Sequence, residues 1–249
     1  MKMMIRIGLS GLAVASSLLS SVSADARVIV HGTRQIFPGG QQEITVRTEN
    51  VGQQASLIQA WVDDGDKNAS PETVQTPFML RPPIYRLDAG KSQAMRVAFS
   101  GGELPQDRES IYWLNILDIP SSPEAGSIPT GNYIQFSLRT RIKLIYRPKG
   151  LNSPAVAPQN LQWSVVEHGG QWRLQVNNPT PYYVHFSALA LRAQGKEFPA
   201  ADFPMVAPMS DQSYILEGLQ GPISGGNVLF QYINDQGGIA ARSAPIAGT

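Results

Sequence analysis

The sequence predicts an all-β protein built from two sandwich domains of the immunoglobulin type. Glycine (23) and proline (19) are spread along the whole chain and separate short runs rich in Val, Ile, Tyr, Phe and Trp. This is the pattern of many strands joined by turns. Helical periodicity is not seen beyond the first twenty residues. The 249 residues suffice for one or two domains with real hydrophobic cores.

The first 24 residues have the order of a secretory signal peptide. Two cations precede an apolar run at 7–19, and small residues then lead to Ala24. This order predicts export, with cleavage after Ala24 or Ala26. A membrane anchor is the alternative, but the run is short and serine-rich for a bilayer core of about 30 Å. No later segment of the sequence is apolar enough, so we expect no membrane insertion.

The balance of charge excludes some partners. The whole chain has 20 Lys and Arg against 19 Asp and Glu, a net charge of +1. Removal of residues 1–24 takes away Lys2 and Arg6, which leaves 18 against 19 and a net charge of −1. A nearly neutral net charge argues against nucleic acid or an anionic membrane surface as the partner, so any basic surface must be local. The chain has no cysteine, which excludes disulfides, thiol catalysis and cysteine-ligated metal.

The first half of the chain predicts one complete sandwich. The segments between the expected strands carry turn residues, as in "PGG" at 38–40 and "DAG" at 88–90. About eight strands in about 120 residues is the density of an immunoglobulin-type sandwich. The expected strands are 27–32, 43–50, 55–62, 75–80, 84–87, 92–100, 110–119 and 133–147.

A Pro/Gly/Asn/Ser stretch at 147–158 has no periodicity and indicates a junction between domains. Strand patterns resume beyond it and fit a second, smaller sandwich. We therefore expect a signal peptide at 1–24, one domain at 25–148 and another at 149–249. The strands expected in the second domain are 161–167, 172–178, 183–192, 214–217, 227–234 and 239–244.

The strand expected at 133–147 is unusual in its length and its two faces. Alternation holds for about fourteen residues, where ordinary strands have about five or six. Bulky apolar side chains dominate the even positions, and Arg139, Arg141 and Lys143 follow one another on the odd face. The strand could place one face in the core and the other in solvent. It could also be added to a partner protein, which would cover an exposed apolar edge.

No group of residues indicates catalysis. The three histidines, His31, His168 and His185, are scattered without metal-site spacing. Nucleophile-elbow, phosphate-loop and dinucleotide motifs are absent from the sequence. The "DDGD" at 63–66 could suggest calcium, but it lacks the later acidic ligands of a calcium loop, so a solvated hairpin tip is favoured. We expect no catalytic residue, no cofactor and no metal.

Two adjacent stretches, "LPQDRESIYWLNILDIP" at 104–120 and "NYIQFSLRTRIKLIYRP" at 132–148, strongly resemble the periplasmic pilus-assembly chaperones of the chaperone–usher pathway, the PapD-like family. The resemblance covers essentially the whole mature chain in the expected order. Further matches are "TRQIFPG" at 33–39, "QAWVDDG" at 59–65, "FMLRPPIYRLDAGKSQAMRV" at 78–97, "NPTPYYV" at 178–184 and "YINDQGG" at 232–238.

The resemblance implies a fold and a function. The family fold is two immunoglobulin-like sandwiches joined at an angle, like a boomerang, and its members are not enzymes. They bind pilus subunits one-to-one in the periplasm by lending a strand, which is called donor-strand complementation. They then deliver the subunits to an outer-membrane usher. Whether the free protein covers its strand as a self-capped homodimer is left open.

The resemblance also implies roles for particular residues. Donor-strand side chains that would fill the subunit's groove fall on Ile134, Phe136 and Leu138. The cations that would grip the subunit's terminal carboxylate match Arg34 and Lys143. A buried ionic network between the domains would comprise Arg96, Glu109, Arg147 and Asp235.

Other positions have simpler expectations. Ile142 and Leu144 continue the donor face and are expected in this protein's own core, whereas Arg139 and Arg141 are expected in solvent. Long-loop members of the family typically carry a cysteine pair beside the loop at 120–131. This chain has none, which favours the short-loop subclass that serves rod-like pili.

Two other classes of protein share some of these features. A secreted structural or adhesin subunit of a pilus is also β-rich, but it usually has one domain and often a disulfide. A carbohydrate-binding or hydrolytic β-sandwich needs clustered aromatic side chains or paired carboxylates, which the sequence does not show.

Overall fold

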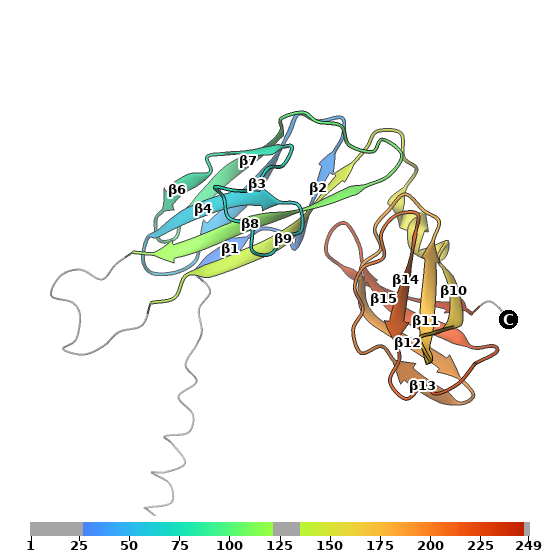
Figure 1. Ribbon diagram of the computed structural model, residues 1–249. Coiled ribbons are helices and arrows are strands. Elements are labelled where there is room, and N and C mark those ends of the chain that lie inside the picture. Colours follow the sequence, from blue (N-terminus) through green and yellow to red (C-terminus); the bar gives the residue numbers. More distant parts are fainter. Residues whose placement is uncertain (1–26, 122–134, 247–249) are drawn as a thin grey trace, which may run out of the picture.

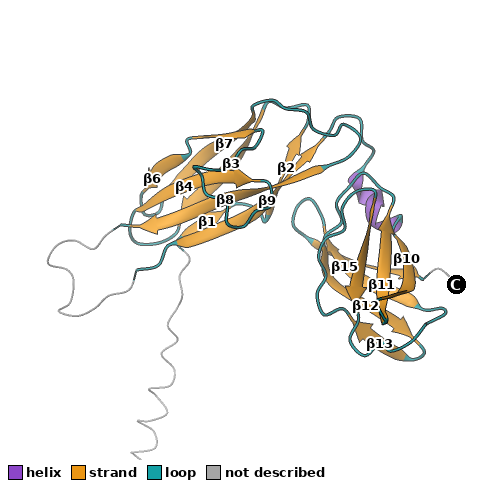
Figure 2. Ribbon diagram, in the orientation of Figure 1, coloured by secondary structure: helices purple, strands orange, loops and turns teal. Residues whose placement is uncertain are grey.

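The computed structural model describes residues 27–121 and 135–246, and within them two β-sandwiches stand at an angle to each other (Figure 1). The predicted fold class is confirmed. The only helix among the described residues is the short 3-10 helix η2, Pro154–Gln159, at the junction between the sandwiches (Figure 2). No helix of the described part is long and apolar enough to cross a membrane. The predicted signal peptide, Ile134 and most of the loop at 120–131 lie outside the described residues.

The N-terminal sandwich consists of two sheets, with strand orders β1-β3-β7-β5 and β2-β9-β8-β4-β6. Apolar side chains from both sheets meet between them, and Phe37, Met95 and Leu114 are fully buried there. The strands are β1 (Val28–Val30), β2 (Arg34–Pro38), β3 (Glu43–Asn50), β4 (Ser56–Asp63), β5 (Phe78–Arg81), β6 (Ile84–Leu87), β7 (Ser92–Phe99), β8 (Ser110–Pro120) and β9 (Leu138–Arg147).

Strand β9 is covered along one side and only half covered along the other. It pairs with β8 over its length, from Asp118↔Leu138 to Ser110↔Tyr146. On its other side it pairs with β2, in parallel, only from Lys143 to Arg147. The backbone of residues 138–142 is therefore an open sheet edge. The expected strand at 133–147 was too long, because residues 135–137 have no paired neighbour and are not extended into the sheet.

The C-terminal sandwich also has two sheets, with orders β10-β11-β14 and β13-β12-β15-β16. Its core is built around Trp163, Leu174, Leu191 and Tyr214, all nearly or fully buried. The strands are β10 (Gln162–His168), β11 (Gln171–Asn178), β12 (Phe186–Ala193), β13 (Lys196–Pro199), β14 (Ser210–Ile215), β15 (Asn227–Ile233) and β16 (Ile239–Pro245).

Two strands, β2 and β13, were not predicted. β2 is a five-residue strand between a turn at Gly32 and the "PGG" turn, and its partner β9 is more than 100 residues away. β13 follows a tight turn in which Gln194 and Gly195 both have positive φ. Short strands with few alternating residues carry little periodic signal, so pairing rather than local pattern defines them.

Candidate functional site

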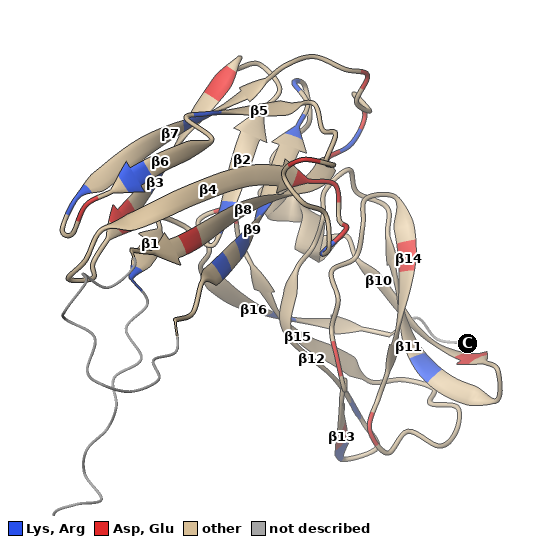
Figure 3. Cartoon of the chain, turned by 60° about the vertical axis from the view of Figure 1, so that its left-hand side comes forward, with Lys and Arg blue, Asp and Glu red and all other residues tan. Residues whose placement is uncertain are grey.

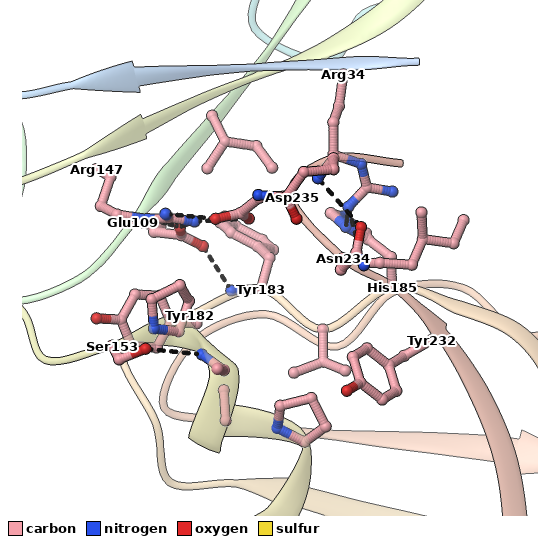
Figure 4. Close-up of a pocket in the computed structure, with 18 residues that line it drawn as sticks. Arg34, Glu109, Arg147, Ser153, Tyr182, Tyr183, His185, Tyr232, Asn234 and Asp235 are labelled. Carbon is pink, nitrogen blue, oxygen red and sulfur yellow. Dashed lines mark hydrogen bonds and ion pairs between the residues drawn. The ribbon is translucent and has the colours of Figure 1, made fainter. Parts of the chain in front are cut away.

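A pocket of about 390 Å³ lies between the two domains. Arg34, Glu109 and Arg147 line it from the N-terminal domain, and Tyr183 and His185 are among the residues that line it from the C-terminal domain (Figure 4). The charged side chains reach it because β2 begins there with Arg34, β9 ends there with Arg147, and β8 begins directly after Glu109. Each cation of this site thus comes from a strand end rather than from a flexible loop.

Arg34 lines this pocket, and Lys143, which is not among the lining residues, lies beside Arg34. They are direct partners in the parallel pairing of β2 with β9, so their side chains leave the same face of the sheet. Arg34 is only 8% exposed, and Lys143 is half-buried. Among the described residues, neither has an acidic partner within ion-pair distance, and Arg34 Nε has no hydrogen-bond partner.

Burial and mutual repulsion hold these cations in an unfavourable state. Burial lowers the pKa of Arg34, with the charges of Asp235 and Glu109 acting in the opposite direction. Burial also lowers the pKa of Lys143, and the charge of Arg34 lowers it further. A carboxylate arriving between them would satisfy both at once, through charge-assisted hydrogen bonds.

His185 contacts Arg34 from the other domain. Arg34 Nη1 donates to His185 Nδ1 at 2.9 Å and to the carbonyl of Ile233 at 3.1 Å (Figure 4). A guanidinium can only donate, so Nδ1 of His185 must be unprotonated. The pKa of His185 is lowered to about 3 by burial and by the charges of Lys143 and Arg34.

A second group of charges joins the domains next to this site. Arg147 donates to Glu109 at 2.7 Å and to both carboxylate oxygens of Asp235, at 2.7 and 3.0 Å. Glu109 also accepts from the backbone N–H of Tyr183 at 2.8 Å. Burial alone would lower the pKa of Arg147, but Asp235 and Glu109 raise it above its ordinary value. Burial raises the pKa of Glu109, and Arg147 offsets only part of that effect.

The apolar side chains next to the open edge of β9 are divided between solvent and core. Phe136 is 79% exposed and Leu138 is 48% exposed, whereas Leu144 is fully buried and Ile142 nearly so. The expectation that Ile142 and Leu144 belong to this protein's own core is confirmed. Gln135 donates to the carbonyls of Pro120 and Ser121, which holds the segment that carries Phe136 close to the end of β8.

The comparisons with known proteins decide the family. Residues 27–152 match the family described as pili and flagellar-assembly chaperone, PapD N-terminal domain, and residues 156–244 match the pili assembly chaperone PapD, C-terminal domain. The chain belongs to the PapD-like family of pilus-assembly chaperones. The protein is therefore a chaperone of pilus assembly and not an enzyme.

The similar proteins have names that agree with this assignment. The probable fimbrial chaperone YadV of Escherichia coli (strain K12) is 40% identical and the match covers 94% of this chain and 96% of the relative. The chaperone protein FimB/FhaD of Bordetella pertussis is 38% identical, over 97% of each chain. The crystal structure of YadV superposes with a TM-score of 0.74 at 38% identity, covering 88% of this chain and all of that one. SafB of Salmonella enterica, in complex with SafA pilin, gives a TM-score of 0.71 at 28% identity, over 90% and 96%.

One residue expected in the ionic network of this chaperone was assigned wrongly. Arg96 lies on β7, in the sheet that does not contain β2 and β9, and its side chain is exposed. Its partner is Glu43 of the neighbouring strand, at 3.0 Å. The structure brings Glu109, Arg147 and Asp235 together but leaves Arg96 outside that group, because Arg96 lies on the exposed face of the other sheet.

The expectation that Arg139 and Arg141 are solvated was also wrong. Arg141 donates through Nε and Nη2 to both carboxylate oxygens of Asp63, and Arg139 donates to Asn115 at 2.9 Å. Their guanidinium groups lie over the rings of Trp61 and Trp113, at 4.7 and 4.6 Å from the ring centroids.

Asp63 at the centre of this cluster is fully buried, so it is not part of a solvated hairpin tip as expected. Burial alone would raise the pKa of Asp63, but hydrogen bonds from Arg141, Asn115 and the Gly65 N–H lower it below its ordinary value. Cross-strand neighbours on β4, β8 and β9 build the cluster, and Figure 3 shows the Lys and Arg positions of β9 as blue bands along that strand. It fixes the outer face of the sheet beside the open edge.

His185 was missed as a site residue. In the sequence it is a single histidine after "NPTPYYV", without a second residue at metal or catalytic spacing. Its position opposite Arg34 depends on how the two domains meet. Only a three-dimensional structure shows that relation, since 151 residues separate the two side chains.

The buried, uncharged His185 predicts an acid-dependent loss of stability. Its folded pKa of about 3 lies below the ordinary value of 6.5, so the unfolded state binds the extra proton between these values. Stability from this group is complete above pH 6.5 and is lost as the pH falls through that window. The cations Arg34 and Lys143 and the stacked ring of Tyr183 face it, and within the described part of the chain no carboxylate lies within ion-pair distance of its ring.

Urea denaturation should therefore show that the wild type loses about 1.4 kcal/mol more than His185→Asn between pH 7.5 and pH 5.5. Subtracting the two proteins removes the titration of groups that they share. Equal losses in both proteins would contradict a neutral, buried His185.

Proposed function

We propose that this chaperone captures pilus subunits one-to-one by donor-strand complementation. The observation that carries the proposal is the open edge of β9 at residues 138–142, which ends at two cations, the buried Arg34 and the half-buried Lys143. A partner strand can pair with this edge, and its end can bind the cations. The unpaired backbone groups of the open edge and the cations at its end therefore form one continuous binding surface for a strand with a charged end.

The chemistry is that of β-augmentation. Main-chain hydrogen bonds to the open edge would provide affinity without reading the partner's sequence, and alternate apolar side chains would enter its groove. Phe136 and Leu138 are exposed and available for this. Ile134, the third expected donor, lies outside the described residues. Burial of each large apolar side chain contributes roughly 1.5–3 kcal/mol.

The position of the cations gives the partner strand a direction. Arg34 and Lys143 lie at the C-terminal end of the open edge. A subunit whose terminal carboxylate binds there must run along β9 toward increasing residue numbers. Its last strand would therefore pair with β9 in parallel, and the carboxylate would fix the register of the apolar side chains.

The cellular setting is part of the proposal. SafB, a similar chaperone, has a solved structure in complex with SafA pilin, which supports pilus subunits as the partner class. We place the protein in the periplasm after removal of residues 1–24, from where it delivers subunits to an outer-membrane usher. The exposed Phe136 and Leu138 also favour a homodimer of free chains, which sedimentation of the subunit-free protein would detect.

Arg34→Ala and Lys143→Ala test the carboxylate site. Truncating one partner of a buried charged contact typically costs about 2–5 kcal/mol, so each variant should yield at least about ten-fold less complex when co-expressed with a pilus subunit. Arg96→Ala is the matched control, because Arg96 is an exposed arginine paired only with Glu43. Normal complex yields from both Arg34→Ala and Lys143→Ala would refute the carboxylate site.

A further inference from the structure

Arg34 of the carboxylate site is hydrogen-bonded to the other domain. Arg34 comes from the N-terminal domain, but both polar groups that its Nη1 contacts, His185 Nδ1 and the Ile233 carbonyl, come from the C-terminal domain. His185 and Ile233 are themselves joined, since the Ile233 N–H donates to the His185 carbonyl at 2.9 Å. Together His185 Nδ1 and the Ile233 carbonyl form one acceptor site for the guanidinium.

The imidazole of His185 in this acceptor site has a defined protonation state. Nδ1 of His185 must be an acceptor because arginine offers only donors. The remaining ring proton is then on Nε2, which faces the sulfur of Met205 at 2.9 Å. The ring also stacks on Tyr183 and is only 3% exposed. The neutral tautomer is thus held from three sides.

The choice of a neutral acceptor has a consequence for ligand binding. A carboxylate in place of His185 would neutralise Arg34 and compete with an incoming anion. An imidazole orients the guanidinium but leaves its full positive charge, so the cation stays available. Arginine also has about 2 kcal/mol of rotamer entropy to lose, and a guanidinium that is already held loses less of it when the ligand binds.

We infer that His185 is a positioning residue that holds Arg34 in the orientation required to bind a peptide's terminal carboxylate, so that the C-terminal domain completes a site whose cations both belong to the N-terminal domain. The inference rests on the proposed function, because it concerns the same carboxylate site. The inference assigns a role to the C-terminal domain, because the acceptor site for Arg34 exists only while the two domains are packed together.

Two nearly isosteric variants separate this role from packing. His185→Asn keeps an acceptor on the same γ-branch as Nδ1, whereas His185→Leu puts a methyl group there. Both lose the ring and its stacking on Tyr183. A difference between them therefore reports the acceptor facing Arg34, and rescue by Asn is a result that a purely structural role would not give.

The probe is a peptide of the last ten residues of a pilus subunit, prepared as the free acid and as the C-terminal amide. The wild-type chaperone should bind the acid about ten-fold more tightly than the amide. His185→Leu should lose most of this preference, and His185→Asn should keep it within about three-fold. Amide binding should be nearly equal in all three proteins, since the apolar contacts do not change.

The outcomes distinguish the two proposals. A wild type without any preference for the acid overturns the carboxylate site itself, and the inference with it. A full acid preference in both wild type and His185→Leu overturns the role of His185 and leaves the carboxylate site intact. Nitrogen-15 NMR of the free wild-type chaperone gives an independent readout: an unprotonated Nδ1 supports the contact with Arg34, and a protonated Nδ1 overturns it.

Discussion

Phe136→Asp is expected to abolish subunit capture while the free chaperone stays folded. The side chain is 79% exposed, and the segment at 135–137 belongs to no sheet, so the fold loses almost nothing. In a complex, the substitution would remove roughly 1.5–3 kcal/mol of apolar burial and would bury an unpaired carboxylate. Co-expression with a pilus subunit should yield no stable complex, and the thermal unfolding midpoint should remain near that of the wild type.

Ser137→Asp is the matched control for this prediction. Ser137 is the next residue, is also exposed, and would point to the opposite side of an extended strand. The same charge introduced there should leave capture largely intact. Loss of the unfolding transition in Phe136→Asp would place Phe136 in the core, and normal capture by that variant would remove it from the donor segment.

Local patterns in the sequence predicted what depends on local chemistry. Alternation along β9 correctly placed Ile142 and Leu144 in the core, because side chains at even spacing leave one face of a strand. Turn residues located most strand ends, because Gly, Pro, Asn and Asp favour the backbone conformations of turns. Transfer of motifs from the family also named Glu109, Arg147 and Asp235, three residues from distant parts of the chain that the structure brings together.

Cross-strand neighbours were beyond the reach of these patterns. Arg139 and Arg141 alternate like solvent-facing residues, and nothing local indicates that Asp63 of β4 lies beside them. Arg96 shows the opposite error, since it was expected in the buried network but lies exposed on the other sheet, paired with Glu43. In each case the missing information is the register between strands or the packing of one domain on the other.

The buried Asp63 gives rise to the largest stability effect that we expect. Asp63→Ala should lower the free energy of unfolding of the N-terminal domain by about 3–5 kcal/mol. The substitution removes the acceptor for Arg141, Asn115 and the Gly65 N–H. It also leaves two arginines side by side without the anion between them. Urea denaturation followed by tryptophan fluorescence would measure the loss, because Trp61 and Trp113 stack on these arginines.

Asp64→Ala controls for the loss of a carboxylate from the same turn. Asp64 is exposed, and its removal should cost less than about 0.5 kcal/mol. Asp63→Asn should lie between the two, because the amide keeps an oxygen acceptor but carries no charge for Arg141. If Asp63→Ala were no less stable than Asp64→Ala, the arginines would be held by their aromatic neighbours alone. Asp63 would then contribute nothing to the position of Arg139 and Arg141 on the outer face of β9.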